Sequence, residues 1–270
     1  MSRLSCRATP RPLCLATGAG NRGRGRRRRW GRENGVPGTV YAPNITPAAL
    51  GDWTDGEIYR AITAGLDRDG EPLFPIMPYA LYGTADPEDI FAVIAYLRTL
   101  PPIETAHPER ELDFSMELIL QTIPVDGTPT KKPRANEHPA YGRYLATIAA
   151  CQECHTAFSD GAFTGPTYAG GREFRFPGLG LIRSANITPD EATGIGGWTR
   201  EQFIARFTEK RAADYAAMVV APQEPNTIMP WWAYAEMSQL DLSAIYDFLM
   251  SLEPVSREVV RFEPLAATVE

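Results

Sequence analysis

The sequence has no long hydrophobic run, and it contains little cysteine. No stretch of about eighteen apolar residues occurs, so a membrane-spanning helix is excluded. Four cysteines in 270 residues are too few for a domain held together by disulfides. Gly170-Gly171 is a glycine pair without the spacing of a phosphate-binding loop, and no Ser-His-Asp arrangement stands out. The remaining composition, 44% hydrophobic and 22% charged, is typical of a globular protein with a buried core.

Positive charge is concentrated near the N-terminus. Residues 1–34 contain ten arginines and one acidic residue, a net charge of +9, whereas the other 17 basic and 32 acidic residues give −15. The acidic remainder argues against nucleic acid as a partner and favours a basic protein. The only apolar stretch of the first segment, 12–20, is too short and too rich in glycine for a convincing export signal. We expect residues 1–34 to be disordered or mistranslated.

The rest of the chain contains a degenerate repeat. Three blocks recur in the same order: Asn44-Ile45-Thr46-Pro47 as Asn186-Ile187-Thr188-Pro189, Gly51-Asp52-Trp53-Thr54 as Gly196-Gly197-Trp198-Thr199, and Ile76-Met77-Pro78 as Ile228-Met229-Pro230. After the third block the two copies stay in register without a gap. The repeat predicts a tandem duplication. Its parts are a first domain at 35–104, a linker at 105–137, a second domain at 138–256 and a tail at 257–270.

Local signals place the repeated blocks on short helices. Helix starts are expected at four N-cap residues: Thr54 and Thr199, which open capping boxes, and Asp86 and Ser238. Apolar residues recur at helical spacing after the last two, and a further helix is expected over about 138–150. Alternating strand patterns are scarce. The predicted fold is therefore all-α, with long loops that need something central to pack around.

The motif that indicates a chemical function is Cys151-Gln152-Glu153-Cys154-His155. Two thiols at this spacing can add across the vinyl groups of one haem, and the adjacent histidine then lies beneath the iron. A thioredoxin-like redox pair would need a βαβ context, which the pattern lacks. A zinc site would need four ligands, but the only other histidines are His107 and His138, and the other cysteines, Cys6 and Cys14, lie in the arginine-rich segment. A chance pair of structural cysteines is the remaining alternative.

Two downstream features support the haem interpretation. Met229 lies in a Met-Pro turn among aromatic residues, where its thioether could fill the sixth coordination position of the iron. Gly165-Pro166 follows the histidine by about ten residues, and the Pro166 carbonyl could accept the Nδ1 proton of His155 and fix the imidazole ring. We therefore expect His155 and Met229 to be the ligands of the iron.

With these motifs, the second copy resembles a class I cytochrome c domain, and the tandem arrangement resembles the multi-haem cytochrome c subunits of periplasmic or membrane-bound dehydrogenases. The resemblance covers about 35–256. It implies haem c, with thioether links at Cys151 and Cys154. It also implies that Arg172, Asn186 and Trp198 either lie near the haem propionates or have simple structural roles.

The resemblance also implies a function. It is that of an electron carrier and not an enzyme, which exchanges electrons with a dehydrogenase, a terminal oxidase or a quinol-linked complex. The expected location is the periplasm, with membrane association through a partner, although the printed N-terminus has no convincing export signal. Two alternatives stay open: a haem enzyme of the peroxidase or thiosulfate oxidoreductase type, and a metal-binding or thiol-redox module.

The first copy departs from the pattern. It keeps Met77 but has no Cys-x-x-Cys-His before it, and the matching position near Leu13 falls in the arginine-rich segment. Cys6 and Cys14 do not have the spacing of the motif. We expect one haem in the chain as printed, and a second only if the true N-terminus differs. Without the missing helix, the first domain should also be the less stable of the two.

Overall fold

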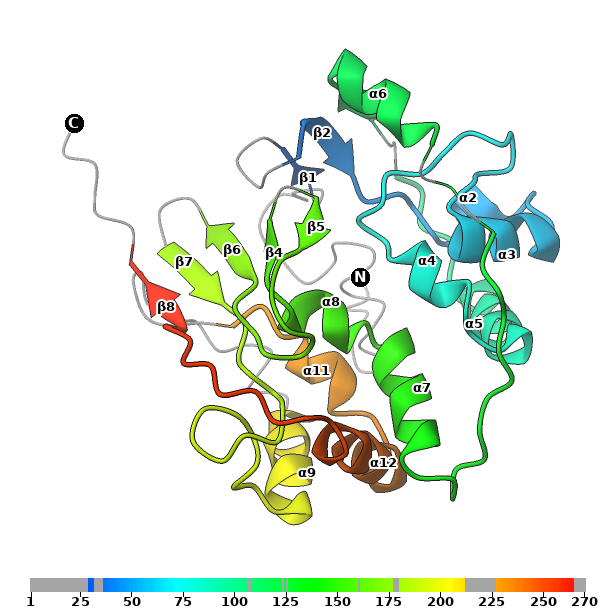
Figure 1. Cartoon of the computed structure of the whole chain (residues 1–270). Coiled ribbons are helices and arrows are strands. Elements are labelled where there is room, and N and C mark those ends of the chain that lie inside the picture. The colour runs from blue at the N-terminus through cyan, green and yellow to red at the C-terminus, as the bar shows by residue number, and fades with distance from the viewer. Residues whose placement is uncertain are drawn as a thin grey trace, which may run out of the picture. The chain divides into compact units, whose positions relative to one another are not determined.

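The computed structural model describes residues 29–31, 36–105, 108–122, 124, 126–159, 161–176, 180–211 and 227–264. The chain divides into two compact units, unit 1 ending at Thr130 and unit 2 beginning at Lys131 (Figure 1). Most of the predicted basic segment, with Cys6 and Cys14, lies outside the described residues, as does His107. Within the described ranges, no helix is both long enough and apolar enough to cross a membrane.

The prediction of an all-α fold is wrong, because three small antiparallel sheets accompany the helices. In unit 1, β1 (Arg29–Trp30), β2 (Gly38–Tyr41) and β3 (Glu111–Leu112) form one sheet. In unit 2, β4 (Phe158–Ser159) pairs with β5 (Ala162–Phe163), and β6 (Glu173–Phe176), β7 (Gly180–Arg183) and β8 (Phe262–Glu263) form the third sheet. Strands of two to four residues are too short to show an alternating pattern, which is why the sequence concealed this mixed α/β fold.

Unit 1 contains five described helices: α2 (Pro47–Leu50), α3 (Asp55–Ala64), α4 (Tyr79–Tyr82), α5 (Pro87–Arg98) and α6 (Phe114–Leu120). The predicted capping box at the start of α3 is confirmed, since Thr54 Oγ1 accepts the Glu57 N–H at 3.2 Å and the Glu57 carboxylate accepts the Thr54 N–H. The predicted N-cap of α5 is also confirmed, because Asp86 accepts the Glu88 N–H. Helix α5 packs on α3 and buries Ile90 and Ile94.

The helices of unit 2 are α7 (Ala140–Ile148), α8 (Cys151–His155), α9 (Arg200–Thr208), α11 (Trp231–Tyr234) and α12 (Gln239–Met250), with a 3-10 turn, η2 (Glu209–Arg211). Thr199 opens a capping box and Ser238 caps α12, as predicted. Helices α7 and α12 lie side by side (Figure 1). Their backbones meet at Gly142, where an added Cβ would lie 1.8 Å from the Ala244 carbonyl oxygen. Glycine at this crossing therefore allows the two helices to pack in direct contact.

The repeated Asn-Ile-Thr-Pro block forms the same buried clamp in both units. The Asn44 side-chain amide donates to the Ile103 carbonyl at 2.8 Å, and the Asn186 amide donates to the Val255 carbonyl at 2.8 Å. The hydroxyls of Thr46 and Thr188 accept the N–H groups of the same two partners, both at 3.2 Å. Each clamp thus ties the Asn-Ile-Thr-Pro block to the chain that follows α5 or α12.

Candidate functional site

The Cys-x-x-Cys-His motif forms a helix of its own, α8. Helix α7 ends at Ile148, and Ala150 then adopts a left-handed conformation, with φ of 53°, before α8 begins at Cys151. A non-glycine residue in this region costs about 1 kcal/mol and persists only where the surroundings impose it. The turn at Ala150 separates the cysteine helix from α7 and places both thiols and the imidazole on about one and a half helical turns.

The imidazole of His155 is oriented by a backbone carbonyl. Its Nδ1 lies 2.8 Å from the Ala185 carbonyl oxygen, and because a carbonyl can only accept, Nδ1 carries the proton. Burial lowers the pKa of His155, an effect that this hydrogen bond opposes and the charge of Arg261 reinforces. The side chain is therefore neutral near pH 7, and the lone pair of its Nε2 atom can coordinate a metal ion.

This contact corrects the prediction for Pro166. The sequence predicts the Pro166 carbonyl as the acceptor of the His155 proton, but in the structure it accepts the Ala169 N–H instead, at 3.2 Å. Ala185 takes the predicted role because Gly170 brings the two segments together. An added Cβ on Gly170, which has φ of 71°, would lie 2.4 Å from the Ala185 carbonyl carbon.

Every residue has a backbone carbonyl, so the residue type of Ala185 gives no sign of its role. The sequence analysis therefore did not predict Ala185 as the partner of His155. The available signal was the glycine pair at 170–171, which marks a close backbone approach. The Gly170 N–H also donates to the His155 carbonyl at 2.7 Å. Gly170 thus holds the backbone of the histidine directly, and the Ala185 segment packed against Gly170 holds its side chain.

Both thiols of the motif are protonated at neutral pH. Burial, reinforced by the neighbouring Cys154, raises the pKa of Cys151 to about 12. Burial also raises the pKa of Cys154, against a smaller opposing effect of Arg172. A redox-active cysteine pair has a lowered thiol pKa, so these values argue against a thioredoxin-like role. Across the described parts of the chain, no group of three or more His, Cys, Asp or Glu side chains could hold a metal ion.

Met229 and Cys151 border the same hydrophobic cluster in unit 2. Its buried members are Ala146, Tyr168, Ile195, Phe203, Phe207, Leu242, Ile245, Phe248 and Leu249. The turn that carries Met229 is also tied to the approach of the cysteine helix, since the Tyr234 hydroxyl on α11 donates to the Ala149 carbonyl at 2.7 Å. The structure therefore brings the predicted thioether ligand and one attachment cysteine to one apolar core.

The remaining predicted residues differ in what they contact. Arg172 lies against α8, where it donates to the Glu153 carbonyl and lies 4.5 Å above the Phe158 ring. Trp198 is 37% exposed, and its carbonyl accepts the hydroxyl of Tyr246 at 2.7 Å. Arg172 thus supports the motif helix directly, while Trp198 joins the start of α9 to α12.

Asn186 has no hydrogen-bonding capacity left for a propionate. Its amide donates to Val255 O and to Thr193 Oγ1, and its oxygen accepts from the N–H and the hydroxyl of Thr188. These four bonds use both donors and both lone pairs of the side chain. Of the two roles expected for Asn186, the structure supports the structural one.

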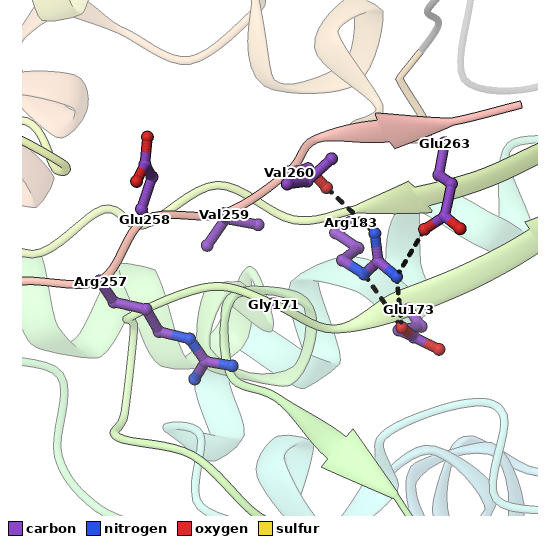
Figure 2. Close-up of a pocket in the computed structure, with 8 residues that line it drawn as sticks. All are labelled: Gly171, Glu173, Arg183, Arg257, Glu258, Val259, Val260 and Glu263. Carbon is purple, nitrogen blue, oxygen red and sulfur yellow. Dashed lines mark hydrogen bonds and ion pairs between the residues drawn. The ribbon is translucent and has the colours of Figure 1, made fainter.

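A pocket of about 450 Å³ opens between the third sheet and the chain that leads into β8. Figure 2 shows Arg183 held between the carboxylates of Glu173 and Glu263, at 2.9 and 3.0 Å. None of the predicted site residues lines it. Because its charged groups largely neutralise one another, we assign the pocket no part in the chemistry of the motif.

Comparison with known proteins agrees with the motif. The fructose dehydrogenase cytochrome subunit of Gluconobacter japonicus is 29% identical over 231 residues, which are 80% of this chain and 45% of that protein. The cytochrome c subunit of the quinone alcohol dehydrogenase of Gluconacetobacter polyoxogenes is 29% identical over 240 residues, 81% of this chain and 49% of that protein. The homologues of this chain are cytochrome c subunits of dehydrogenases.

Other comparisons show how much of the chain and of its relatives the similarity covers. A diheme c-type cytochrome of Cereibacter sphaeroides is 31% identical over 128 residues, 44% of this chain and 43% of that protein. No protein-family model matches the chain. The chain spans about half the length of the dehydrogenase cytochrome subunits it matches.

The residues of α8 fit the haem c that cytochrome c relatives imply. Two neutral thiols lie three residues apart, as addition to two vinyl groups requires. The adjacent imidazole is neutral, and its Nδ1 is engaged by Ala185. A thioether borders the same apolar core. Imidazole and thioether are the axial ligands of electron-carrying cytochromes c.

Proposed function

We propose that this chain is a c-type cytochrome that carries single electrons for a dehydrogenase. The observation that carries the proposal is the hydrogen bond from His155 Nδ1 to Ala185, beside two neutral thiols on the same short helix. In this proposal Cys151 and Cys154 hold the haem covalently, and His155 and Met229 are its axial ligands. When bound, the haem iron supplies a reversible one-electron redox couple.

The protein residues have three tasks in this function. The Ala185 carbonyl keeps the proton on Nδ1, so that Nε2 retains its lone pair as the ligand atom. Arg172 and Gly170 hold α8 in place, because they donate hydrogen bonds to the backbone carbonyls of Glu153 and His155. The apolar cluster that Met229 borders provides a nonpolar environment, which together with a soft thioether ligand raises the reduction potential relative to bis-histidine ligation.

We further propose one haem per chain, bound to unit 2, and a periplasmic location in association with a dehydrogenase. Unit 1 keeps Met77 but has no counterpart of α8 among its described residues. The dehydrogenase association is supported by the names of the relatives, which are subunits of fructose, alcohol and gluconate dehydrogenases. The acidic body of the chain suits docking on a basic surface of such a partner.

Expression with a complete cytochrome c maturation system tests the haem assignment. We expect a pyridine haemochrome spectrum and a protein mass that includes one covalent haem. The double variant Cys151→Ser, Cys154→Ser should lose all covalent haem, whereas the matched control Met77→Leu in unit 1 should keep it. Colourless wild-type protein would overturn the proposal, and two haems per chain would overturn the assignment to unit 2 alone.

The Met229→Ala variant separates the electron carrier from a haem enzyme. We expect it to retain the covalent haem but to lose the methionine-to-iron charge-transfer band of the oxidised protein and to show a lower reduction potential. A band that is absent from the wild-type protein, or unchanged in the variant, would mean that Met229 is not a ligand. That outcome would favour a haem enzyme with an open or exchangeable sixth position.

A further inference from the structure

The chain that follows α12 returns to the segment that carries Ala185. Strand β8 pairs with β7, and beside this pairing the Arg261 carbonyl accepts the Arg183 N–H at 2.9 Å. Earlier in the same stretch, the Val255 carbonyl accepts the Asn186 side-chain amide at 2.8 Å. Ala185 lies between Arg183 and Asn186 in the sequence, so residues 255–263 are bound on both sides of the carbonyl that orients the histidine.

Arg257 lies in the middle of this stretch, before β8 (Figure 2). Its backbone N–H donates to Thr193 Oγ1 at 2.9 Å, and the same oxygen accepts the Asn186 side-chain amide at 3.1 Å. The backbone of Arg257 is therefore joined through one hydroxyl to the residue that follows Ala185.

The guanidinium of Arg257 lies in a slot between two glycines. An added Cβ on Gly165 would lie 2.5 Å from Nη1, and one on Gly171 would lie 2.6 Å from Nη2 and 3.0 Å from Cζ. Residues without a side chain leave the room that the guanidinium occupies. The Gly171 N–H in turn donates to the Ser184 carbonyl at 2.9 Å. The side chain of Arg257 is thus packed against a glycine that binds the residue before Ala185.

Packing, and not an ion pair, holds this guanidinium. The carboxylates of Glu173 and Glu263 bind Arg183, at 2.9 and 3.0 Å, and Arg257 has no ion pair in the part of the chain that the structure describes. The flat shape of a guanidinium suits a narrow slot, whereas a lysine would place a compact ammonium there. The shape of the Arg257 side chain therefore matters more at this position than its charge.

We propose that Arg257 is a positioning residue that holds the Ala185 carbonyl against Nδ1 of His155. The inference rests on the proposed function, because it gives this hydrogen bond a consequence once haem is bound. A hydrogen bond donated by Nδ1 makes the imidazole a more basic ligand, and a more basic ligand favours the oxidised iron. Arg257 thus keeps the reduction potential lower than it would be with a loosely held imidazole.

The variant Arg257→Lys tests this role in the haem-loaded chain, since it keeps the charge but does not fill the slot. NMR of the reduced protein follows the Nδ1 proton of His155, and we expect this proton to exchange with water about tenfold faster in the variant. The reduction potential should rise. Amide protons of α12 should keep their exchange rates, which separates a local loosening of Ala185 from a loss of stability.

The control Arg175→Lys makes the same substitution in β6, where the side chain is 63% exposed and lies 3.4 Å from Glu173. It should change the exchange of the Nδ1 proton by less than about twofold and leave the potential unchanged.

Three outcomes would overturn the inference. Unchanged proton exchange and potential in haem-loaded Arg257→Lys would do so and leave the proposed function intact. Equal acceleration of the α12 amides would mean that Arg257 only stabilises unit 2 as a whole. A wild-type chain without covalent haem would overturn the proposed function and this inference with it.

Discussion

Units 1 and 2 share a set of matching helices and a matching hydrogen-bonded clamp, but they differ in which further helices the structure describes. Both have the Asn-Thr clamp, a capping box at the start of α3 or α9, and a side-chain N-cap at the start of α5 or α12. Helices α7 and α8 belong to unit 2, and the described part of unit 1 has no counterpart of either. The repeat therefore preserves a set of matching helices, while the proposed chemistry depends on α7 and α8, which belong to unit 2 in the part of the chain that the structure describes.

The two units also differ in how well their buried groups are satisfied. Among the described residues, the Tyr79 hydroxyl and Arg60 Nε of unit 1 are buried without a hydrogen-bond partner. An unpaired buried polar group costs about 1–3 kcal/mol. Val93 and Tyr96 of α5 are 47% and 39% exposed, whereas the matching Ile245 and Phe248 of α12 are buried, so α5 contributes less apolar burial to its unit. We therefore expect unit 1 to open at lower free energy than unit 2, as native-state hydrogen exchange would measure.

Gly142→Leu should have the largest effect on this difference. The new side chain would collide with the Ala244 carbonyl and separate α7 from α12, with a loss of about 3 kcal/mol in the unfolding free energy of unit 2. Hydrogen exchange monitored by mass spectrometry resolves the two units. The control Gly56→Ala in α3 meets only Thr54 Oγ1, at 4.0 Å, and should stabilise unit 1 by about 0.5 kcal/mol. Unchanged protection of unit 2 in Gly142→Leu would contradict the close helix crossing.

Removal of the clamp should produce the next largest effect, in both units. Asn186→Ala breaks four hydrogen bonds and leaves buried backbone groups unpaired, so we expect a loss of about 2–3 kcal/mol in unit 2. Asn44→Ala should destabilise unit 1 by a smaller amount, because three such bonds are present there. Urea titrations followed by hydrogen exchange compare the two variants. Loss of haem from Asn186→Ala without loss of stability would instead indicate a role at the cofactor.

A pH-dependent ion pair gives the smallest expected effect. Asp247 on α12 accepts from His138 at 2.6 Å and from Arg200 at 2.6 Å. Burial tends to raise the pKa of Asp247, but these two hydrogen bonds outweigh it and lower the pKa below its usual range. The ionised carboxylate thus stabilises the folded state above the unfolded pKa of about 4, and this contribution disappears as the pH falls through the lower folded value.

Asp247→Asn should therefore destabilise unit 2 by about 1 kcal/mol at pH 7, and the difference from the wild type should vanish in strong acid. Urea unfolding at pH 7 and over a series of falling pH values down to strong acid measures this change. The more exposed pair of Arg98 with Asp55 in unit 1, at 3.0 Å, provides the comparison, and Asp55→Asn should cost less. An effect of Asp247→Asn that stays constant with pH would contradict an ionic origin.

Several features were predictable because their signals are local. Capping boxes at Thr54 and Thr199 rest on a side chain and a backbone N–H three residues apart, and both formed as expected. The homology to cytochrome c subunits was likewise indicated by five consecutive residues, from Cys151 to His155, and by the Met-Pro repeat. Such patterns can be recognised in a sequence because the cap or the cofactor attachment itself requires that spacing of residues along the chain.

The features that sequence reasoning missed depend on pairing between distant backbone segments. Strand β7 pairs with β8 across some eighty residues, and neither strand is long enough to alternate visibly. The partner of His155 is likewise a carbonyl thirty residues away, at Ala185. Carbonyl oxygens are the same on every residue, so neither pairing could be recognised from residue type.

The amino-acid sequence alone determined where several helices begin, which residues are the candidates to hold a cofactor and which blocks are repeated, because these properties depend on neighbours along the chain. Only the tertiary structure decided that Ala185 orients the histidine, that Asn186 is fully engaged in the clamp, and that Val93 and Tyr96 of α5 are exposed where the matching Ile245 and Phe248 of α12 are buried. Each of these depends on which distant groups come within a few ångströms, and packing alone sets that distance.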